Sequence, residues 1–442
     1  MNDSHSDPRS KPPQFPSHNG PRVWFITNGA SPVGIGVARQ VLEHGDFVVA
    51  GVLPEELDKT NGNDHGRAED FKAFLDEVRA KGDGNGNHGV DVEMGGADED
   101  DENVGSEEEE QGDPSISRAG AKRWKDRVKV VGLDGRNIGQ CQAAVAEAVH
   151  AFGKIDIMLG CSSEAIIGTI EELAQSHRTQ TLFRSQFETN FFANVNIIKA
   201  ILPTMRSQRN GHIVMLTGIT AHLGTPGMGM YCSSQWALEG YCDSLAYEIA
   251  PFNVKLTLVQ PNLEIGVLSN MITSAPPMQE YRADVNPAPL SRDILSGLLD
   301  KLSGAVDSRA ADTPAEKESP EGASPASASS ARPRSNGNAR DAGSPMPEPT
   351  MGDLLHSSSV TSVYPPLQPV VKGALVAETV YAIAAIGGHD NPPARHIVGS
   401  EAITSVKEKL KTVSEELEDF IESSMSVDFA KNEGIISLAP VV

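Results

Sequence analysis

The stretch YCSSQ, which begins at Tyr231, places a phenol and an amide four residues apart in a segment with helical character. Side chains at positions i and i+4 share one face of a helix, so Gln235 is expected to lie beside Tyr231. A cation in that place would ease ionisation of the phenol and suit it to proton transfer during hydride-transfer chemistry. An amide carries no charge, so the pKa of Tyr231 is expected to stay near the free value of about 10. The segment therefore indicates either an enzyme with altered chemistry or an enzyme's fold that no longer performs it.

Seven short apolar runs predict the strands that must position this pair of residues. Each run is rich in Val, Ile and Phe without alternating polar residues, which is typical of strands buried on both faces of a parallel sheet. The runs cover residues 22–27, 47–53, 128–133, 155–160, 211–217, 254–260 and 395–399.

Stretches with apolar residues at helical spacing alternate with these runs. This alternation predicts an α/β fold of the doubly wound Rossmann type, with a parallel sheet and helices on both of its faces, in a single domain. One helical stretch passes through Phe187, Phe191, Val195, Ile198 and Leu202, and another through Val406, Leu410, Val413, Leu417 and Phe420.

Two segments have compositions that cannot pack into a core and are expected to be disordered inserts. Residues 91–113 hold twelve acidic and no basic side chains, so they cannot bury apolar surface and repel one another. The second segment is rich in Ser, Pro and Ala. The expected division is a tail over 1–21, a domain over 22–430 interrupted by inserts at 91–117 and 303–369, and a tail over 431–442.

Charge and composition restrict the classes of partner. A net charge of −23 argues against a nucleic-acid surface, while the acidic insert is either a solvated loop or a docking tract for a basic protein. The chain shows neither a secretory signal nor a later apolar run of membrane-spanning length. Its four cysteines fall at no metal-ligand or disulfide spacing. We therefore expect a cytoplasmic protein without a metal site or a membrane partner.

The order and spacing of several blocks resemble the short-chain dehydrogenase/reductase family over residues 22–430, apart from the two inserts. The family members are oxidoreductases that use NAD or NADP, so the resemblance implies such a cofactor and a hydroxyl or carbonyl substrate. The blocks that carry it are LD at 133–134, FGKIDIM at 152–158, QFETNFFANVNIIKAILPTMR at 186–206, GHIVMLT at 211–217 and the segment GTPGMGMYCSSQWALEGY that begins at residue 224.

Carried over by this resemblance, two catalytic positions are kept and two are lost. Tyr231 matches the family's proton donor and acceptor, and Asn190 matches the asparagine that anchors a relay water. The family's serine, which bonds the substrate oxygen, falls at Gly218, and its lysine falls at Gln235. Two hydroxyls near Gly218 could replace that serine if the loop were reshaped, those of Thr217 and Thr220.

The cofactor turn TNGASPVGIG, which starts at Thr27, fits the family pattern TGxxxGxG in two registers. The register without a gap is favoured because it keeps the normal length of the helix, and it leaves only one of the three glycines. It places Asn28, Pro32 and Gly34 at the glycine positions, whereas a gapped register uses Gly29, Gly34 and Gly36. Because proline removes an N–H donor, phosphate binding is expected to be weakened.

Other cofactor positions match the family unevenly. Asp134 matches the acidic residue that contacts adenine, and Pro261 matches the first residue of the Pro-Gly pair after the sixth strand. The second strand ends without the arginine that selects a 2′-phosphate, and the Asn-Asn-Ala-Gly turn is replaced by GCSS at 160–163. NAD or NADP is therefore the implied cofactor, with weak or absent binding.

Two functions follow from these positions. The first is a pseudo-oxidoreductase, in which the family fold is kept as a binding or regulatory module with impaired or lost catalysis. The alternative is a divergent NAD(P)-dependent oxidoreductase that acts on a hydroxyl or carbonyl of a small apolar substrate. The resemblance also implies a homodimer, because family members often pair through the two helices that carry Asn190 and Tyr231.

Overall fold

The structure is a computed structural model of the chain. It describes residues 14–57, 67–83, 123–269, 272–282, 284–285, 291–310, 364 and 367–426. The expected acidic insert at 91–117 and the tail at 431–442 lie outside these residues.

A seven-stranded parallel sheet forms the centre of the molecule, and each of the seven predicted runs forms one of its strands. The strand order is β3-β2-β1-β4-β6-β7-β9, which reverses direction between β1 and β4, as in doubly wound folds. This confirms the predicted fold class. The strands are β1 (Val23–Ile26), β2 (Phe47–Val52), β3 (Val128–Gly132), β4 (Ile157–Gly160), β6 (Gly211–Leu216), β7 (Val254–Pro261) and β9 (Arg395–Val398).

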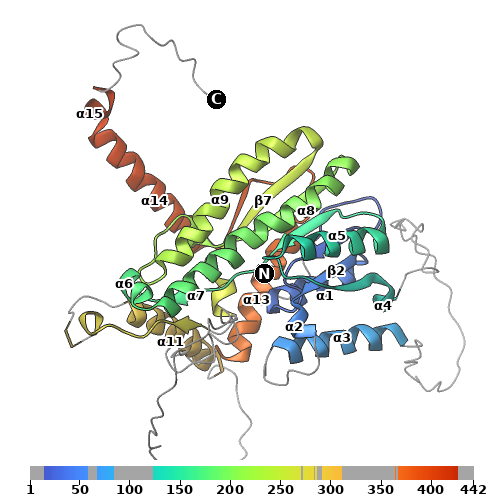
Figure 1. The fold of residues 1–442 in the computed structure, drawn as a ribbon, viewed down its shortest axis with the longest axis horizontal. Coiled ribbons are helices and arrows are strands. Elements are labelled where there is room, and N and C mark those ends of the chain that lie inside the picture. The colour runs from blue at the N-terminus through green and yellow to red at the C-terminus, as the bar shows by residue number, and fades with distance from the viewer. Residues whose placement is uncertain are drawn as a thin grey trace, which may run out of the picture.

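Helices cover both faces of the sheet, and each face has its own apolar cluster (Figure 1). Alternate strand residues point to opposite faces, so Trp24 and Ile26 join one cluster while Val23 and Phe25 join the other. One layer contains α1 (Pro32–His44), α3 (Arg67–Asp83) and α13 (Pro369–Ile386). The opposite layer contains α5 (Ile138–Phe152), α8 (Ala193–Gln208) and α9 (Gly229–Ile249).

Two further apolar clusters are formed by shorter elements together with residues of α9, α11 and α13. Among the shorter elements, β5 pairs with β8 in a small parallel sheet of its own. A π-helix, η2 (Glu188–Phe192), joins α7 to α8. The remaining elements discussed below are α6 (Ile170–Ala174), α7 (His177–Phe187), β5 (Ile166–Ile167), the 3₁₀ helix η3 (Ile219–Ala221), α10 (Ile265–Leu268), β8 (Thr273–Ser274), α11 (Ser291–Ala310), α14 (Ser400–Asp419) and α15 (Ile421–Met425).

The ends of the expected second insert belong to the fold. Helix α11 runs to Ala310, past the expected start of the insert at residue 303. At the other end, Tyr364 and Leu367 are 7% and 8% exposed and lie in the same apolar cluster as Leu299 of α11. Part of the expected N-terminal tail also packs on the body, because the ring of Phe15 stacks on His44.

Helix α13 is the one helix of the described residues that is long and apolar enough to cross a membrane, by length and composition only. The expectation that no run reaches that length is therefore not met on those criteria. In the fold, however, α13 packs on α1, where the position of a Cβ on Gly36 would lie 2.7 Å from Val380 Cγ2. A helix in the core of a domain meets the same two criteria.

Candidate active site

Tyr231 lies in the first turn of α9, with its side chain only 2% exposed. Its hydroxyl donates a hydrogen bond to Glu264 Oε2 at 2.8 Å and lies 3.3 Å from Ser163 Oγ. Burial raises the pKa of Tyr231 well above 10, and the neighbouring Glu264 carboxylate raises it further. The phenol is therefore protonated at neutral pH, and its proton is already directed to a carboxylate.

Glu264 was not predicted as a site residue. It follows strand β7 and immediately precedes α10, and its Oε1 accepts a hydrogen bond from the backbone N–H of Thr220 at 3.1 Å. Burial raises the pKa of Glu264, although its bonds to Thr220 and Tyr231 act in the opposite direction. The side chain lies deep in the fold but keeps some exposed surface, because it lines a pocket.

Gly218, at the position of the family's serine, makes room for this carboxylate. A Cβ on Gly218 would overlap both oxygens of Glu264. The backbone of Gly218 has φ −150°, an extended conformation that any residue can adopt, so space rather than backbone geometry requires glycine here. The Glu264 carboxylate thus occupies the space next to Tyr231 that a serine side chain would take.

Gln235 lies on the same helix as Tyr231, as predicted, and is 3% exposed. Its Oε1 has no hydrogen-bond partner among the described residues. Among the described residues, the Gln235 amide therefore provides neither a charge nor a hydrogen bond to the Tyr231 phenol. The expected site residues are brought together, but the cation that would activate Tyr231 is missing.

Asn190 lies in the π-helix η2, and local irregularities of this kind are frequent at functional sites. Its Oδ1 accepts from the backbone N–H of Glu164 at 2.8 Å, and its Nδ2 donates to the carbonyl of Glu164 at 2.9 Å and to Ser234 Oγ at 3.1 Å. The Asn190 side-chain amide therefore forms three hydrogen bonds with other protein groups. In this arrangement Asn190 joins η2 to α9 and to the segment after β4.

The two threonines near Gly218 do not replace the serine. Both side chains are buried, and Thr217 Oγ1 accepts a hydrogen bond from Gln260 Nε2 at 3.5 Å. Thr220 meets the site through its backbone N–H, which donates to Glu264. Neither hydroxyl forms a described hydrogen bond to Tyr231.

An apolar pocket adjoins Glu264, with a cavity volume of about 170 Å³. It extends beneath α11, and Thr220 and Glu264 supply polar atoms at one side. Its apolar walls include Ile167, Leu223, Met228, Val267, Leu268 and Leu295.

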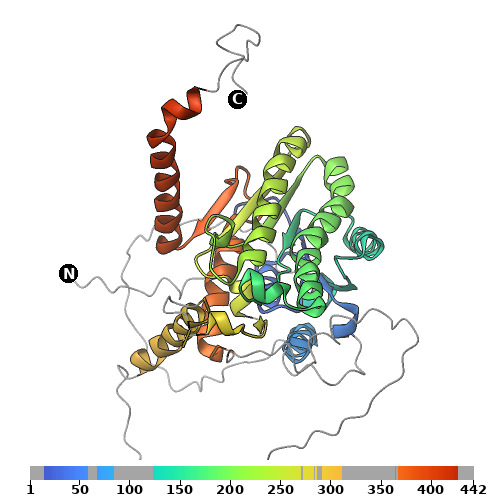
Figure 2. The ribbon, with the colours of Figure 1, turned by 60° about the vertical axis from the view of Figure 1, so that its left-hand side comes forward.

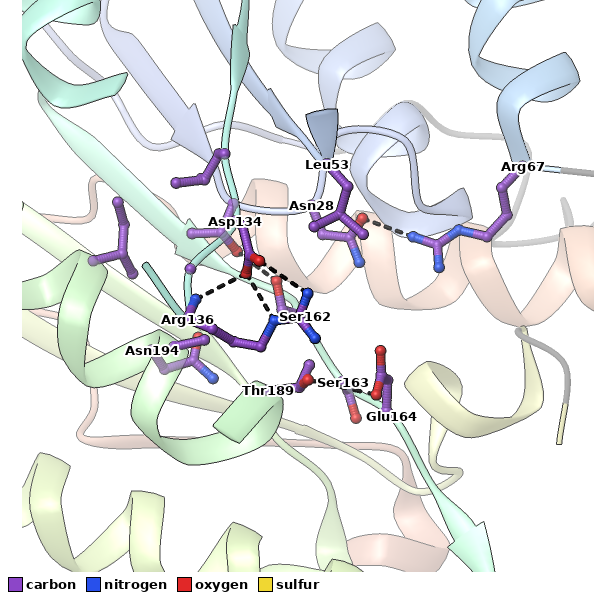
Figure 3. A pocket seen from close by; sticks show the side chains of 15 residues that line it. Asn28, Leu53, Arg67, Asp134, Arg136, Ser162, Ser163, Glu164, Thr189 and Asn194 are labelled. Carbon is purple, nitrogen blue, oxygen red and sulfur yellow. Dashed lines mark hydrogen bonds and ion pairs between the residues drawn. The ribbon is translucent and has the colours of Figure 1, made fainter. Parts of the chain in front are cut away.

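A second pocket, of about 70 Å³, lies at the carboxyl ends of β1, β3 and β4 (Figure 3). Thr27, Asn28 and Asp134 line it, as expected for residues of a nucleotide site. Arg136 binds Asp134 through its backbone N–H at 3.0 Å and through Nε and Nη2 at 2.9 Å each. Burial alone would raise the pKa of Asp134, but the bonds from Arg136 hold it below its ordinary value. The acidic residue that was predicted to meet adenine is thus already paired.

Arg67 closes the same pocket from the side of α3 (Figure 3). Its Nη2 donates to Asn28 Oδ1 at 2.8 Å, above the turn that would hold a pyrophosphate. Glu164 lies near Arg67, Arg136 and Thr189. Burial raises the pKa of the Glu164 carboxyl. Three charged side chains in addition to Asp134 therefore surround this small cavity.

The strand-to-helix turn fits the gapped register, not the ungapped one favoured from the sequence. A Cβ on Gly29 would lie 2.7 Å from Ala50 Cβ, and a Cβ on Gly34 would overlap the carbonyl oxygen of Asn28. Gly36 is equally close to Val380, so these three positions are the crowded ones. The helix is not shortened, because α1 begins earlier, at Pro32, and continues to His44.

The first turn of α1 offers few free donors. Pro32 has no N–H, and Ser31 Oγ accepts the N–H of Gly34 at 3.0 Å. After β4, Cys161 N–H donates to Thr27 Oγ1 at 3.1 Å, so the GCSS segment is tied to the turn. Pro261 is buried at the end of β7, three residues before Glu264.

One cluster among the described residues has the composition of a metal site, namely His18, His44 and Asp46. Asp46 already binds Arg22 at 2.9 Å, which places a cation beside the carboxylate. The two imidazoles lie 2.8 Å apart at Nε2 and share a hydrogen bond. These contacts satisfy the cluster without an ion.

Comparisons with known proteins agree with this architecture. The sequence model of the family described as short chain dehydrogenase matches residues 101–275. Oxidoreductase BOA17 of Botryotinia fuckeliana is 30% identical over 54% of this chain and 65% of its own. The 3-ketodihydrosphingosine reductase of Bacteroides thetaiotaomicron is 36% identical over 30% of this chain and 48% of its own. Retinol dehydrogenase 8 of Homo sapiens is 28% identical over 33% of this chain and 43% of its own.

The chain thus covers between 43% and 65% of the length of these relatives. Among solved structures, a short-chain dehydrogenase from Streptomyces avermitilis is similar with a TM-score of 0.52 at 16% identity, covering 93% of this chain and 100% of that one. At this identity the likeness concerns the fold. The family match, the curated relatives and the common fold agree: the chain has the fold of the short-chain dehydrogenase/reductase family and is similar in sequence to its members, which are oxidoreductases that typically bind NAD(P).

Proposed function

We propose that this member of the family is a pseudo-oxidoreductase, a binding module that has kept the fold and lost hydride transfer. The hydrogen bond from Tyr231 to Glu264, in the space left by Gly218, is the observation that carries the proposal. A general acid must be free to meet the substrate oxygen, whereas this phenol donates its hydrogen bond to the Glu264 carboxylate. Reversing the step would require a phenolate beside a second anion, which electrostatic repulsion opposes.

The nucleotide side supports weak or absent NAD(P) binding. A dinucleotide would have to enter a cavity of about 70 Å³ and compete with Arg136 for Asp134. Its pyrophosphate would meet a helix start whose first N–H is missing at Pro32 and whose third is accepted by Ser31. Arg67 would also have to leave Asn28.

The apolar pocket supports a ligand-binding role with altered polarity. In the family pattern, Tyr and Ser donate hydrogen bonds to a carbonyl oxygen, whereas here a carboxylate faces the pocket. An acceptor prefers a ligand that donates, so an apolar molecule that ends in a hydroxyl or an amine fits better than a ketone. Two relatives are named for 3-ketodihydrosphingosine and for retinol, both largely apolar molecules with a polar end.

Calorimetric titration with matched ligands tests this proposal. A long-chain primary alcohol, the corresponding amine and the corresponding methyl ketone are titrated against the wild-type chain and against Glu264→Leu. We expect the alcohol and the amine to bind about tenfold more tightly than the ketone, since a further hydrogen bond to a charged acceptor contributes roughly 1.5–3 kcal/mol and the ketone has no donor to form it. Glu264→Leu should remove the preference, and the exposed control Glu248→Gln should keep it. Equal or tighter binding of the ketone to the wild type would refute the proposed polarity.

A divergent oxidoreductase is the second candidate, because Tyr231 and Asn190 are retained and Tyr231 contacts Glu264, which lines the apolar pocket. It would act on the hydroxyl or carbonyl of a small apolar substrate with NAD(P). Turnover that depends on Tyr231 separates this candidate from the first.

A further inference from the structure

Helix α14 and the short α15 stand away from the body of the molecule (Figures 1 and 2). Several large apolar side chains on them are exposed to solvent, which is unusual for a surface helix without a partner. The exposed fractions are 40% for Ile403, 62% for Leu410, 38% for Val413, 65% for Leu417 and 66% for Phe420.

These side chains follow a heptad pattern. Together with Val406, they occupy positions 403, 406, 410, 413, 417 and 420, with alternating steps of three and four residues. Such spacing places all six on one seam of a helix, as in the a and d positions of a coiled coil. Val406 is the only one of them that is buried, at 5% exposure. The rest of the seam has no cover among the described residues.

We propose that this seam packs against the same seam of a second copy of the chain, with the two helices antiparallel. This interface is separate from the pairing through α8 and α9 that the family resemblance implies. In the antiparallel arrangement, Leu410 of one copy packs against Val413 of the other, and Ile403 lies near the other copy's Phe420. Ile403, Leu410, Val413 and Phe420 thus each meet an exposed apolar side chain of the partner, while Leu417 lies over the helix at Val406, which its own copy buries.

Charge complementarity selects a second copy as the occupant and antiparallel as the orientation. The first half of α14 carries Lys407 and Lys409 next to the seam, and its two acidic residues, Glu401 and Glu408, lie on the opposite side of the helix. The second half and α15 carry five acidic residues and one basic residue, Lys411. Parallel pairing would place the acidic halves together, whereas antiparallel pairing places each against the lysines of the other copy. The acidic residues are Glu415, Glu416, Glu418, Asp419 and Glu422.

Lys409 and Glu416 flank the seam on the same side, seven residues apart. In the proposed register Lys409 of each copy lies beside Glu416 of the other, so the pair occurs twice in the dimer. A helix of 20 residues is about 30 Å long, so the seam is at the small end of stable interfaces. We therefore expect a dimer that dissociates on dilution.

Sedimentation-velocity centrifugation of the full chain over a wide concentration range tests the proposal. We expect a monomer–dimer equilibrium for the wild type, and a monomer at every concentration for Leu410→Asp combined with Leu417→Asp. Lys409→Glu and Glu416→Lys should each weaken the dimer about fivefold to tenfold, because each places like charges together twice. The double variant Lys409→Glu/Glu416→Lys should restore wild-type affinity, since it exchanges the two charges of the pair.

Lys411→Glu is the matched control, because it makes the same charge change on the same helix away from the seam, where Lys411 contacts Glu415. It should leave the dimer intact. All substituted side chains in the seam are exposed in one copy, so the melting temperature of the monomer should not change. The proposal would be overturned by a wild-type chain that stays monomeric. This holds whether the seam is free, covered by residues of the same chain or bound to vesicles of neutral lipid. Failure of the double charge exchange to restore the dimer would also overturn it.

Discussion

At the scale of single residues, the site differs from the family's catalytic pattern by a matched pair of residues, Gly218 and Glu264. The family resemblance implied that Asn190, Tyr231, Gly218 and Gln235 would share one site, because they match the family's four catalytic positions. It did not predict Glu264, whose position after β7 has no catalytic role in the family pattern. The sequence does show a glycine in place of the family's serine at 218 and an acidic residue at 264. Only the fold shows that the Glu264 carboxylate fills the space that the serine side chain would take.

Restoring the serine alone should destabilise the protein. In Gly218→Ser the new Cβ overlaps the Glu264 carboxylate, which must leave Tyr231 and the Thr220 N–H. Losing bonds of this kind costs about 1–3 kcal/mol, to be measured by urea unfolding. Adding Glu264→Ala should recover most of the loss. Equal stability of Gly218→Ser and the wild type would mean that the carboxylate does not need this space.

The raised pKa of Glu264 predicts a pH dependence of stability. The folded chain holds the proton of Glu264 more tightly than the unfolded chain does. In the unfolded chain the carboxyl has its ordinary pKa of 4.5. The contribution of Glu264 to the free energy of unfolding is therefore fully present at low pH. It declines as the pH rises from the pKa of Glu264 in the unfolded chain to its higher pKa in the folded chain, and it is constant at higher pH. Glu264→Gln should show a shallower decline across that range in the free energy of unfolding, whereas the exposed control Glu248→Gln should follow the wild type. Parallel curves for wild type and Glu264→Gln would contradict this account.

At the scale of elements, the strands were predictable because buried parallel strands are continuous apolar runs, and all seven appear in the sheet. The turn register was not predictable, since the choice between Gly29 and Asn28 depends on a contact with Ala50 of the neighbouring strand β2. The limits of the second insert were also missed. Tyr364 and Leu367 stand in a Pro-rich stretch whose composition conceals two buried side chains.

Deletions should reveal these limits. Removing residues 315–358 should change the melting temperature by no more than a few degrees, because the cut spares α11 and both buried side chains. Extending the deletion to 305–367 removes Tyr364 and Leu367, and loss of large buried side chains costs about 2–5 kcal/mol each. Differential scanning calorimetry should therefore show a clearly lower melting temperature for the longer deletion only. A large effect of the shorter one would show that the removed residues support the fold.

At the scale of the whole molecule, the family fold persists while its two functional halves have both changed. The sheet, the helical layers and the π-helix still bring Asn190 and Tyr231 to one place. Glu264 accepts the hydrogen bond of Tyr231, the residue that matches the family's catalytic tyrosine. Arg136 pairs with Asp134, the residue that matches the family's adenine contact. The fold therefore follows from the apolar pattern, whereas the proposed loss of chemistry rests on a few polar contacts between distant segments.

The central claim, that the chain does not transfer hydride, is tested most directly by a turnover assay. Oxidation of NADH and of NADPH is followed with a panel of ketones and quinones, using the wild-type chain and Tyr231→Phe, which keeps the ring and removes the hydroxyl. We predict no turnover by the wild type above that of Tyr231→Phe, since the phenol is bonded to Glu264 and lacks a neighbouring cation. Reduction of any compound by the wild type at a rate that Tyr231→Phe abolishes would contradict the claim and establish the divergent oxidoreductase instead.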